Sequence, residues 1–290
     1  MRESMKAALL YCKRKFGIIL LCVFSLPTVL PLWFIITGSF MGSGEFMANF
    51  SAILEETTGK VFWPFFPAYP TLRYYVELLM DTPSFLVVFW NSCKQVFPSL
   101  FGQLLIAVPA AWSFARFKFK GKKAVFTIYI ILMIMPFQVT MVSSYLVLDS
   151  INLLDSHLAI ILPAAFSTFP VFIMVKFFKS IPRSIIDAAK IDGAGEWRIF
   201  WSIGIPLGRG GIISAIILDF LELFNAIEQP LNFIKTPSLM PMTLYLPGVS
   251  AGKAGISLVV SLIMLLPALL IFIYGQRYLE QGIMVSGLKE

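Results

Sequence analysis

The part of the sequence that decides the fold lies between residues 180 and 206. It reads Ser180-Ile-Pro-Arg-Ser-Ile-Ile-Asp-Ala-Ala-Lys-Ile-Asp-Gly-Ala-Gly-Glu-Trp-Arg-Ile-Phe-Trp201 and continues Ser202-Ile-Gly-Ile-Pro206. Pro182 suits the first turn of a helix, where its missing N–H is not needed. Three apolar residues share one face of that helix, at i, i+4 and i+8: Ile181, Ile185 and Ala189. Gly193 and Gly195 allow a tight turn, and residues 196–201 begin a second short helix. The stretch therefore predicts a helix–turn–helix with small residues at its tip.

Two interpretations of this hairpin are open. It can be an amphipathic hairpin that lies on the inner membrane surface and only fills space. It can instead be a docking element that inserts its tip into a groove on a cytoplasmic partner. Small side chains permit close approach, and Asp187 could fix the register against a cation of the partner.

The composition around the hairpin is that of an integral membrane protein. Of the 290 residues, 58% are hydrophobic and 13% are charged, whereas soluble domains carry about 25% charged residues. A disordered chain and a disulfide-stapled secreted domain are excluded. The three cysteines form neither a zinc pattern nor a disulfide framework, and we expect no metal site.

Six apolar stretches are long enough to cross a bilayer as helices, which takes about 20 residues. We predict spans at 16–44, 86–115, 124–148, 156–178, 203–228 and 254–276 within a single permease domain of residues 1–290. The fifth is unusual because it contains Arg209, Asp219 and Glu222. Prolines lie within or at the ends of every span, where each is expected to bend its helix.

The basic residues predict the orientation, because loops rich in Lys and Arg stay in the cytoplasm. Most of the 23 basic residues fall in the tail 1–15, in the loop after the second span, in the connection after the fourth span (residues 176–198, with Arg209 just beyond) and near the C-terminus. Both termini are therefore expected to be cytoplasmic, with extracytoplasmic loops at 45–85 and 229–253. The net charge of +7 thus reflects topology, and we expect no nucleic-acid partner.

Residues 187–194 of the hairpin, Asp187-Ala-Ala-Lys-Ile-Asp-Gly-Ala194, are followed by Phe200, Ile203 and Pro206. This pattern resembles the EAA motif of ABC-importer permeases. Further matching pieces are Asn91-Ser92, residues 110–121, Phe224-Asn225, residues 229–231 and Gln276-Arg277-Tyr278. Together they resemble the carbohydrate-uptake permeases of the malto-oligosaccharide type, in particular the shorter permease of maltose transporters. Asp187 departs from the pattern, because the family usually has Glu there.

The resemblance implies an all-α membrane protein with the six transmembrane helices of the type I ABC importer permease fold, in a prokaryotic cell membrane. In this family the EAA segment is the coupling helix, which fits a cleft in a separate ATPase. Eight residues of this chain match it: Asp187, Ala188, Ala189, Asp192, Gly193, Ala194, Phe200 and Pro206.

The implied partners are a second homologous permease, two ATP-binding subunits and an extracytoplasmic solute-binding protein, with a sugar as substrate. The chain contains no Gly-x-x-x-x-Gly-Lys-[Ser/Thr] phosphate loop. We therefore expect a pore subunit that is not an enzyme and binds no cofactor, with ATP and Mg²⁺ held by the partner ATPase.

A polar stripe in the fifth span is the candidate translocation path. Its residues follow one another at intervals of three: Asp219, Glu222, Asn225 and Glu228. A charge in the bilayer is costly and usually faces a partner or water. The stripe can line the path and bond sugar hydroxyls, or it can pack against the partner permease.

Residues 244–255 match the loop that, in relatives, can reach into the sugar cleft of the binding protein. The candidate contacts are Pro247, Gly248, Ser250 and Gly252. An idle flexible connection is the alternative for this segment.

Three other functions are open to this sequence. An ABC permease for a non-sugar solute would share the hairpin. In an ion-coupled secondary transporter Asp219 and Glu222 would be proton or sodium sites. Such a protein has no need of the EAA-like segment, and the sequence shows no visible inverted repeat. A membrane-embedded enzyme would use the same carboxylates, but no catalytic constellation accompanies them.

Overall fold

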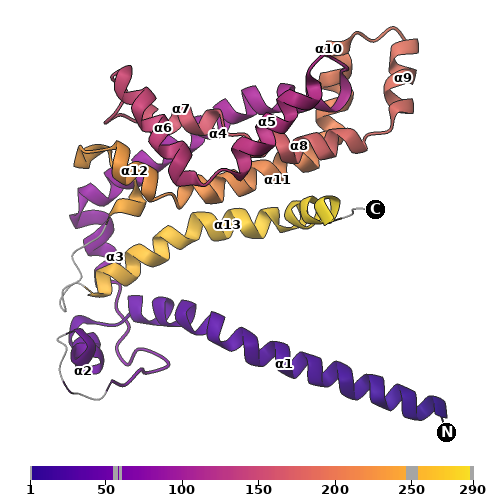
Figure 1. Ribbon diagram of the computed structural model, residues 1–290. Helices are drawn as coiled ribbons and strands as arrows, with labels where there is room; N and C mark the ends of the chain where they lie inside the picture. The colour runs from indigo at the N-terminus through magenta and orange to yellow at the C-terminus, as the bar shows by residue number, and fades with distance from the viewer. Residues whose placement is uncertain (1, 55–57, 59–60, 246–253, 288–290) are drawn as a thin grey trace. The chain divides into compact units, whose positions relative to one another are not determined.

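The computed structural model describes residues 2–54, 58, 61–245 and 254–287 of the chain (Figure 1). Over these residues it is helical, and its one extended pairing is an isolated bridge between Met41 and Pro70. The chain divides into two compact units. The first consists of residues 1–82 and 246–263, and the second of residues 83–245 and 264–290.

The first unit is built around one long apolar helix, α1 (Arg2–Ser39). It also contains α2 (Ser43–Leu54), α3 (Arg73–Val76), a π-helical turn (Glu77–Asp81) and the beginning of α13 (Ala254–Gly287). Its core joins Met41, Phe46, Phe50 and Ala254, with Phe34, Trp63 and Leu258 packed against them. Aromatic burial therefore holds the end of α1 to α2 and to the start of α13.

In the second unit, α4 (Pro83–Arg116), α8 (Phe169–Ser180) and α11 (Ile205–Phe224) pack side by side (Figure 1). At one end of these helices lie α9 (Arg183–Ile191) and α10 (Glu196–Ile199), which a π-helical turn (Phe200–Gly204) joins to α11. The other end holds α6 (Phe137–Ser150), α7 (Leu158–Ala165), α12 (Glu228–Phe233) and two 3-10 turns (Pro237–Leu239 and Met242–Leu244). The hairpin and the α12 region are thus at opposite ends of one helical unit.

Helices lie over all six predicted spans. Five helical stretches are long and apolar enough to cross a membrane: Lys15–Ser39, Pro83–Arg116, Leu158–Ser180, Glu196–Phe224 and Ala254–Tyr278. Leu158–Ser180 is interrupted between α7 and α8 at residues 166–168. The third predicted span is not one continuous helix. It consists of α5 (Lys122–Ile134) and α6, which meet at an angle of 103° around Met135 and Pro136. Pro136 lacks the N–H that a continuing helix would need, and Met135 already has extended backbone angles.

Candidate functional site

The predicted hairpin is formed by α9 and α10, joined by a glycine turn. Gly193 has a φ of +80°, a conformation that residues with a Cβ rarely adopt. Its N–H donates to the carbonyl of Lys190 (3.0 Å), and the N–H of Ala194 donates to the carbonyl of Ala189 (2.9 Å). These two bonds form a Schellman cap, which satisfies the last carbonyls of α9. An exposed ion pair between Lys190 and Glu196 (2.5 Å) also spans the turn.

The face of α9 that packs on the protein differs from the predicted one. Ile186 is buried and Ala189 is half-buried against the core, whereas Ile185 is 40% exposed. Ile181 is buried but precedes the helix, because α9 begins at Arg183, after the extended Pro182. The predicted face was therefore wrong at Ile185, whose place on the packed face Ile186 takes, whereas Ile181 and Ala189 pack inward.

Trp112 of α4 is the centre of the hairpin's attachment to the spans. Its side chain is 3% exposed and contacts the rings of Phe178 (5.4 Å between centroids) and Phe200 (5.8 Å). A Cβ added at Gly204 would lie 2.7 Å from the Trp112 ring, and one at Gly208 would lie 2.3 Å from the Phe178 ring. Only glycine allows the π-helical turn and α11 to approach these rings so closely at the two positions.

Arg116, one turn beyond Trp112, ties the same helices together through their backbone. Its guanidinium Nη2 donates to the carbonyls of Phe178 and Ile181, the latter at 2.6 Å. These carbonyls lie at the C-terminal end of α8, where a helix lacks its own donors and favours a cation. The hairpin is thus connected to α4, α8 and α11 by packing and by hydrogen bonds.

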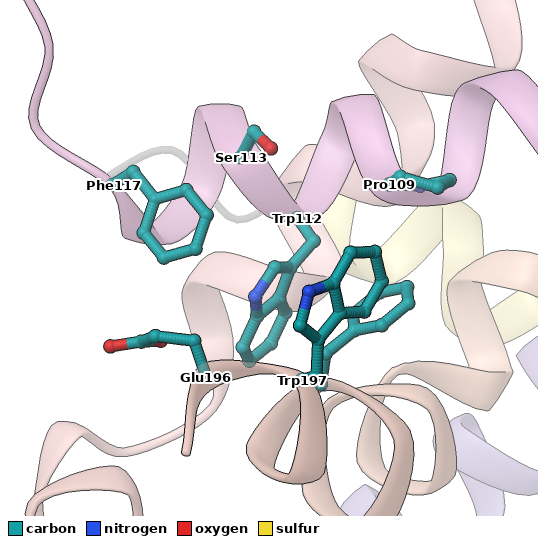
Figure 2. Close-up of a pocket in the computed structure, with 7 residues that line it drawn as sticks. Pro109, Trp112, Ser113, Phe117, Glu196 and Trp197 are labelled. Carbon is teal, nitrogen blue, oxygen red and sulfur yellow. The ribbon is translucent and has the colours of Figure 1, made fainter.

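Figure 2 shows a pocket beside the hairpin, with a volume of about 200 Å³, between α4 and the α10 turn. Trp112 and Trp197 lie near each other in it, with Phe117 and Glu196 at its edge. Trp197 is 72% exposed, and the indole Nε1 of Trp112 is buried without a hydrogen-bond partner among the described residues. The surface next to the tip is therefore aromatic and accessible.

The eight predicted coupling residues divide into an exposed and a packed set. Five are exposed: Asp187, Ala188, Asp192, Gly193 and Pro206. Ala189 and Ala194 are half-buried against the core, and Phe200 is buried in it. Asp187 also lines a cleft of about 220 Å³ with Arg116, Lys118, Arg183, Lys190 and Glu196. Cations thus outnumber carboxylates in that cleft.

A second candidate site is a polar cavity of about 420 Å³ inside the second unit. Its acidic lining residues are Asp219, which is 3% exposed, and Glu222, which is exposed. Hydroxyl and amide side chains complete its polar lining: Gln103, Thr140, Ser144, Ser167, Thr168 and Gln229. Donors and acceptors of this kind can bind a polyhydroxylated molecule.

Two broken helices face this cavity. Met135, at the bend between α5 and α6, lines it, as do residues 166–168 between α7 and α8. Irregular backbone at membrane depth is tolerated where it lines a cavity. The sequence showed the prolines at both breaks, but it did not show that the breaks meet.

Two residues of the predicted polar stripe lie elsewhere. α11 ends at Phe224, so Asn225 and Glu228 are not on its face. Asn225 donates its amide Nδ2 to the carbonyl of Leu221 (2.7 Å), and Glu228 accepts a hydrogen bond from Gln138 (3.3 Å). Neither lines the polar cavity.

A buried polar row on α4 was not identified from the sequence. Its members recur every four residues: Asn91, Gln95, Ser99 and Gln103. Asn91 donates to the carbonyls of Ser238 (2.7 Å) and Met240 (3.1 Å), and Gln95 donates to that of Leu239 (3.1 Å). The sequence does contain a signal for this row, because a spacing of four residues places all four side chains on one helical face.

Asp155 also holds the loop that contains these carbonyls, at residues 235 and 236. Its carboxylate accepts hydrogen bonds from the N–H groups of Lys235 and Thr236 (both 2.8 Å) and from the Thr236 hydroxyl (2.6 Å). These bonds hold the pKa of Asp155 below its ordinary value. The predicted binding-protein contacts that follow this loop, Pro247, Gly248, Ser250 and Gly252, lie outside the described residues.

Comparison with known proteins agrees with this architecture. A family model described as "Binding-protein-dependent transport system inner membrane component" matches residues 103–285. The chain is 30% identical to the lactose transport system permease protein LacG of Rhizobium radiobacter, over 71% of this chain and 76% of that protein. It is 26% identical to the arabinooligosaccharides transport system permease protein AraQ of Halalkalibacterium halodurans, over 90% and 91% respectively.

One solved structure supports the fold. It is a bacterial ABC transporter involved in the import of the acidic polysaccharide alginate, and one of its chains superposes with a TM-score of 0.75. The match covers 91% of this chain and 96% of that one, at 21% sequence identity. The expected permease fold is therefore confirmed.

Proposed function

The chain belongs to the family of binding-protein-dependent transport system inner membrane components, and from this premise we propose that it takes up a sugar or oligosaccharide as one half of an ATP-driven pore. It is a multi-pass membrane protein and a transport permease. In more detail, we propose that its α9–α10 hairpin docks on a separate ATPase. ATP binding there would shift the pore between an inward-open and an outward-open state.

The attachment of the hairpin carries this proposal. A hairpin that only rested on the membrane would not have to pack on the spans. Here Ile186, Ile199 and Phe200 are buried against α4, α8 and α11, whereas Ile191 and Trp197 are exposed. The other face leaves Asp187, Ala188 and Gly193 accessible, as a docking surface requires.

The polar cavity supports a sugar as the substrate. Its volume falls within the range of about 300–1,000 Å³ that is typical of small-molecule sites, and hydroxyl, amide and carboxylate groups line it. LacG and AraQ are named for lactose and for arabinooligosaccharides. We propose that Asp219 and Glu222 contact the sugar or order its path.

The remaining parts of the importer would come from other chains. We propose a second homologous permease as the other half of the pore, two ATP-binding subunits that hold ATP and Mg²⁺, and an extracytoplasmic binding protein that delivers the sugar. This chain would bind no cofactor itself, since its sequence lacks the phosphate-binding loop.

The test is to purify the chain from its native membrane with its partners and to measure sugar-stimulated ATP hydrolysis and uptake in liposomes. We expect Asp187→Arg to abolish the stimulation while the complex still assembles. Asp149→Arg is the matched control, because Asp149 is also exposed but lies on α6, away from the hairpin. Wild-type coupling in Asp187→Arg, or ion-driven uptake by the chain alone, would contradict the proposal.

A further inference from the structure

A second polar cavity, separate from the hairpin and from the proposed sugar path, lies between α8, α11 and α13. Its volume is about 640 Å³. Its polar lining residues are Arg209, Tyr274, Gln276, Arg277 and Tyr278, and its apolar ones are Phe177, Leu207 and Ile273. Among the described side chains no carboxylate lines it, and neither arginine takes part in an ion pair. Two guanidinium groups therefore share one concave site, with no carboxylate of the described side chains beside them.

The walls of this cavity are held in place by close packing. The Ser214 hydroxyl on α11 donates to the carbonyl of Tyr278 on α13 (2.7 Å). A Cβ added at Gly275 would lie 2.2 Å from Ile217, and one at Gly211 would lie 2.5 Å from Phe177. α11 is thus in direct contact with both α13 and α8, so the two arginines are presented by fixed helices.

The surface of α13 above the cavity is apolar and exposed. Leu266, Leu270 and Ile273 recur at i, i+4 and i+7, and Arg277 follows four residues later on the same face. The three aliphatic side chains are between 45% and 51% exposed. This arrangement places an aliphatic stripe directly before a cationic pocket at the end of a membrane-spanning segment.

We propose that this cavity binds the phosphate headgroup of an anionic phospholipid, with the acyl chains along the α13 stripe. Guanidinium groups recognise phosphate through paired hydrogen bonds. Basic pockets between transmembrane helices on the cytoplasmic side bind anionic headgroups, and the charge distribution of the sequence predicts that side here. A covering protein surface would satisfy the stripe, but it would also have to bring a carboxylate to the two arginines.

The test is native mass spectrometry of the complete purified importer, after incubation with phosphatidylethanolamine vesicles that contain phosphatidylglycerol. We expect the wild type to retain phosphatidylglycerol in preference to phosphatidylethanolamine. In Arg209→Gln/Arg277→Gln its affinity should fall about 30-fold, as expected when two basic contacts of about 1 kcal/mol each are lost. Arg209→Lys/Arg277→Lys keeps both positive charges and should retain part of the affinity. Such retention shows that the loss in the glutamine variant comes from the lost charges and not from unfolding.

Lys120→Gln/Lys123→Gln is the matched control, since it removes two exposed cations on the same side but outside the cavity. An equal loss in this control would overturn the proposal in favour of a general surface charge effect. Unchanged retention in the arginine variant would also overturn it. So would binding of inorganic phosphate without lipid, or crosslinking of Leu270→Cys to the partner permease instead of to lipid.

Discussion

Replacing Trp112 tests whether the hairpin is coupled to the spans through one buried ring. Trp112→Ala removes the contacts with Phe178 and Phe200 and the stacking with Arg116 (5.6 Å). Truncation of a buried Trp to Ala costs about 3–5 kcal/mol. We expect this loss of unfolding free energy, together with ATP hydrolysis that no longer depends on sugar.

Trp112→Phe separates the packing from the polar part of the indole. Two fewer buried carbons cost about 1.6 kcal/mol, at about 0.8 kcal/mol each. The lost N–H, however, has no partner among the described residues, and leaving such a donor unsatisfied costs about 1–3 kcal/mol. The two effects nearly cancel, so Trp112→Phe should be close to neutral and should remain coupled.

Equilibrium unfolding of the permease in lipid bicelles measures the stability of both variants, and uptake per ATP hydrolysed in liposomes measures their coupling. Equal losses in Trp112→Phe and Trp112→Ala would refute the reasoning about the orphan N–H. Normal coupling in a folded Trp112→Ala would refute the role of the ring in attaching the hairpin.

Three further predictions follow from local geometry. Gly193→Ala should destabilise the hairpin by about 1–2 kcal/mol, because a Cβ is strained at a φ of +80°, whereas Gly193→Asn should cost less; protease nicking of the turn reports the difference. The lowered pKa of Asp155 means that its bonds to the 235–236 loop stabilise the fold above pH 3.8, its ordinary pKa, and that this contribution disappears as the pH falls below that value. Hydrogen exchange at the Thr236 amide should therefore be faster in Asp155→Asn than in the wild type at pH 7, and the two should converge in acid. Glu222→Gln should raise the KM for sugar uptake about tenfold if the carboxylate accepts a sugar hydroxyl, and an unchanged KM would place the sugar elsewhere.

Features that depend on local sequence were predictable. The six helical regions follow from long runs without charge, the turn at Gly193 follows from its glycine, and the break at Pro136 follows from its missing N–H. The size of that bend, 103°, was not predictable, since a proline fixes only where a helix ends. The packed face of α9 was misjudged because it depends on the helix starting at Arg183.

Features that depend on distant partners were not predictable. The row from Asn91 to Gln103 is buried because backbone carbonyls about 60 to 150 residues away accept its amides. Without those partners, polar residues in an apolar run are equally consistent with a water-lined face. The polar stripe was extended to Asn225 and Glu228 for a similar reason, because the end of α11 at Phe224 carries no helix-breaking residue.

The two candidate sites are joined by the same helices. Phe200 packs on Trp112 at the hairpin, and the chain continues through α11 to Asp219 in the polar cavity. At 1.5 Å per residue this path is about 28 Å long. α4 makes the same connection, since Trp112 contacts the hairpin and Gln103 lines the cavity. Packed helices move as units rather than deforming continuously. We therefore expect a displacement imposed on the hairpin to reach both walls of the cavity. If the sugar binds there and holds those walls in one arrangement, as proposed, it should resist that displacement by the same free energy.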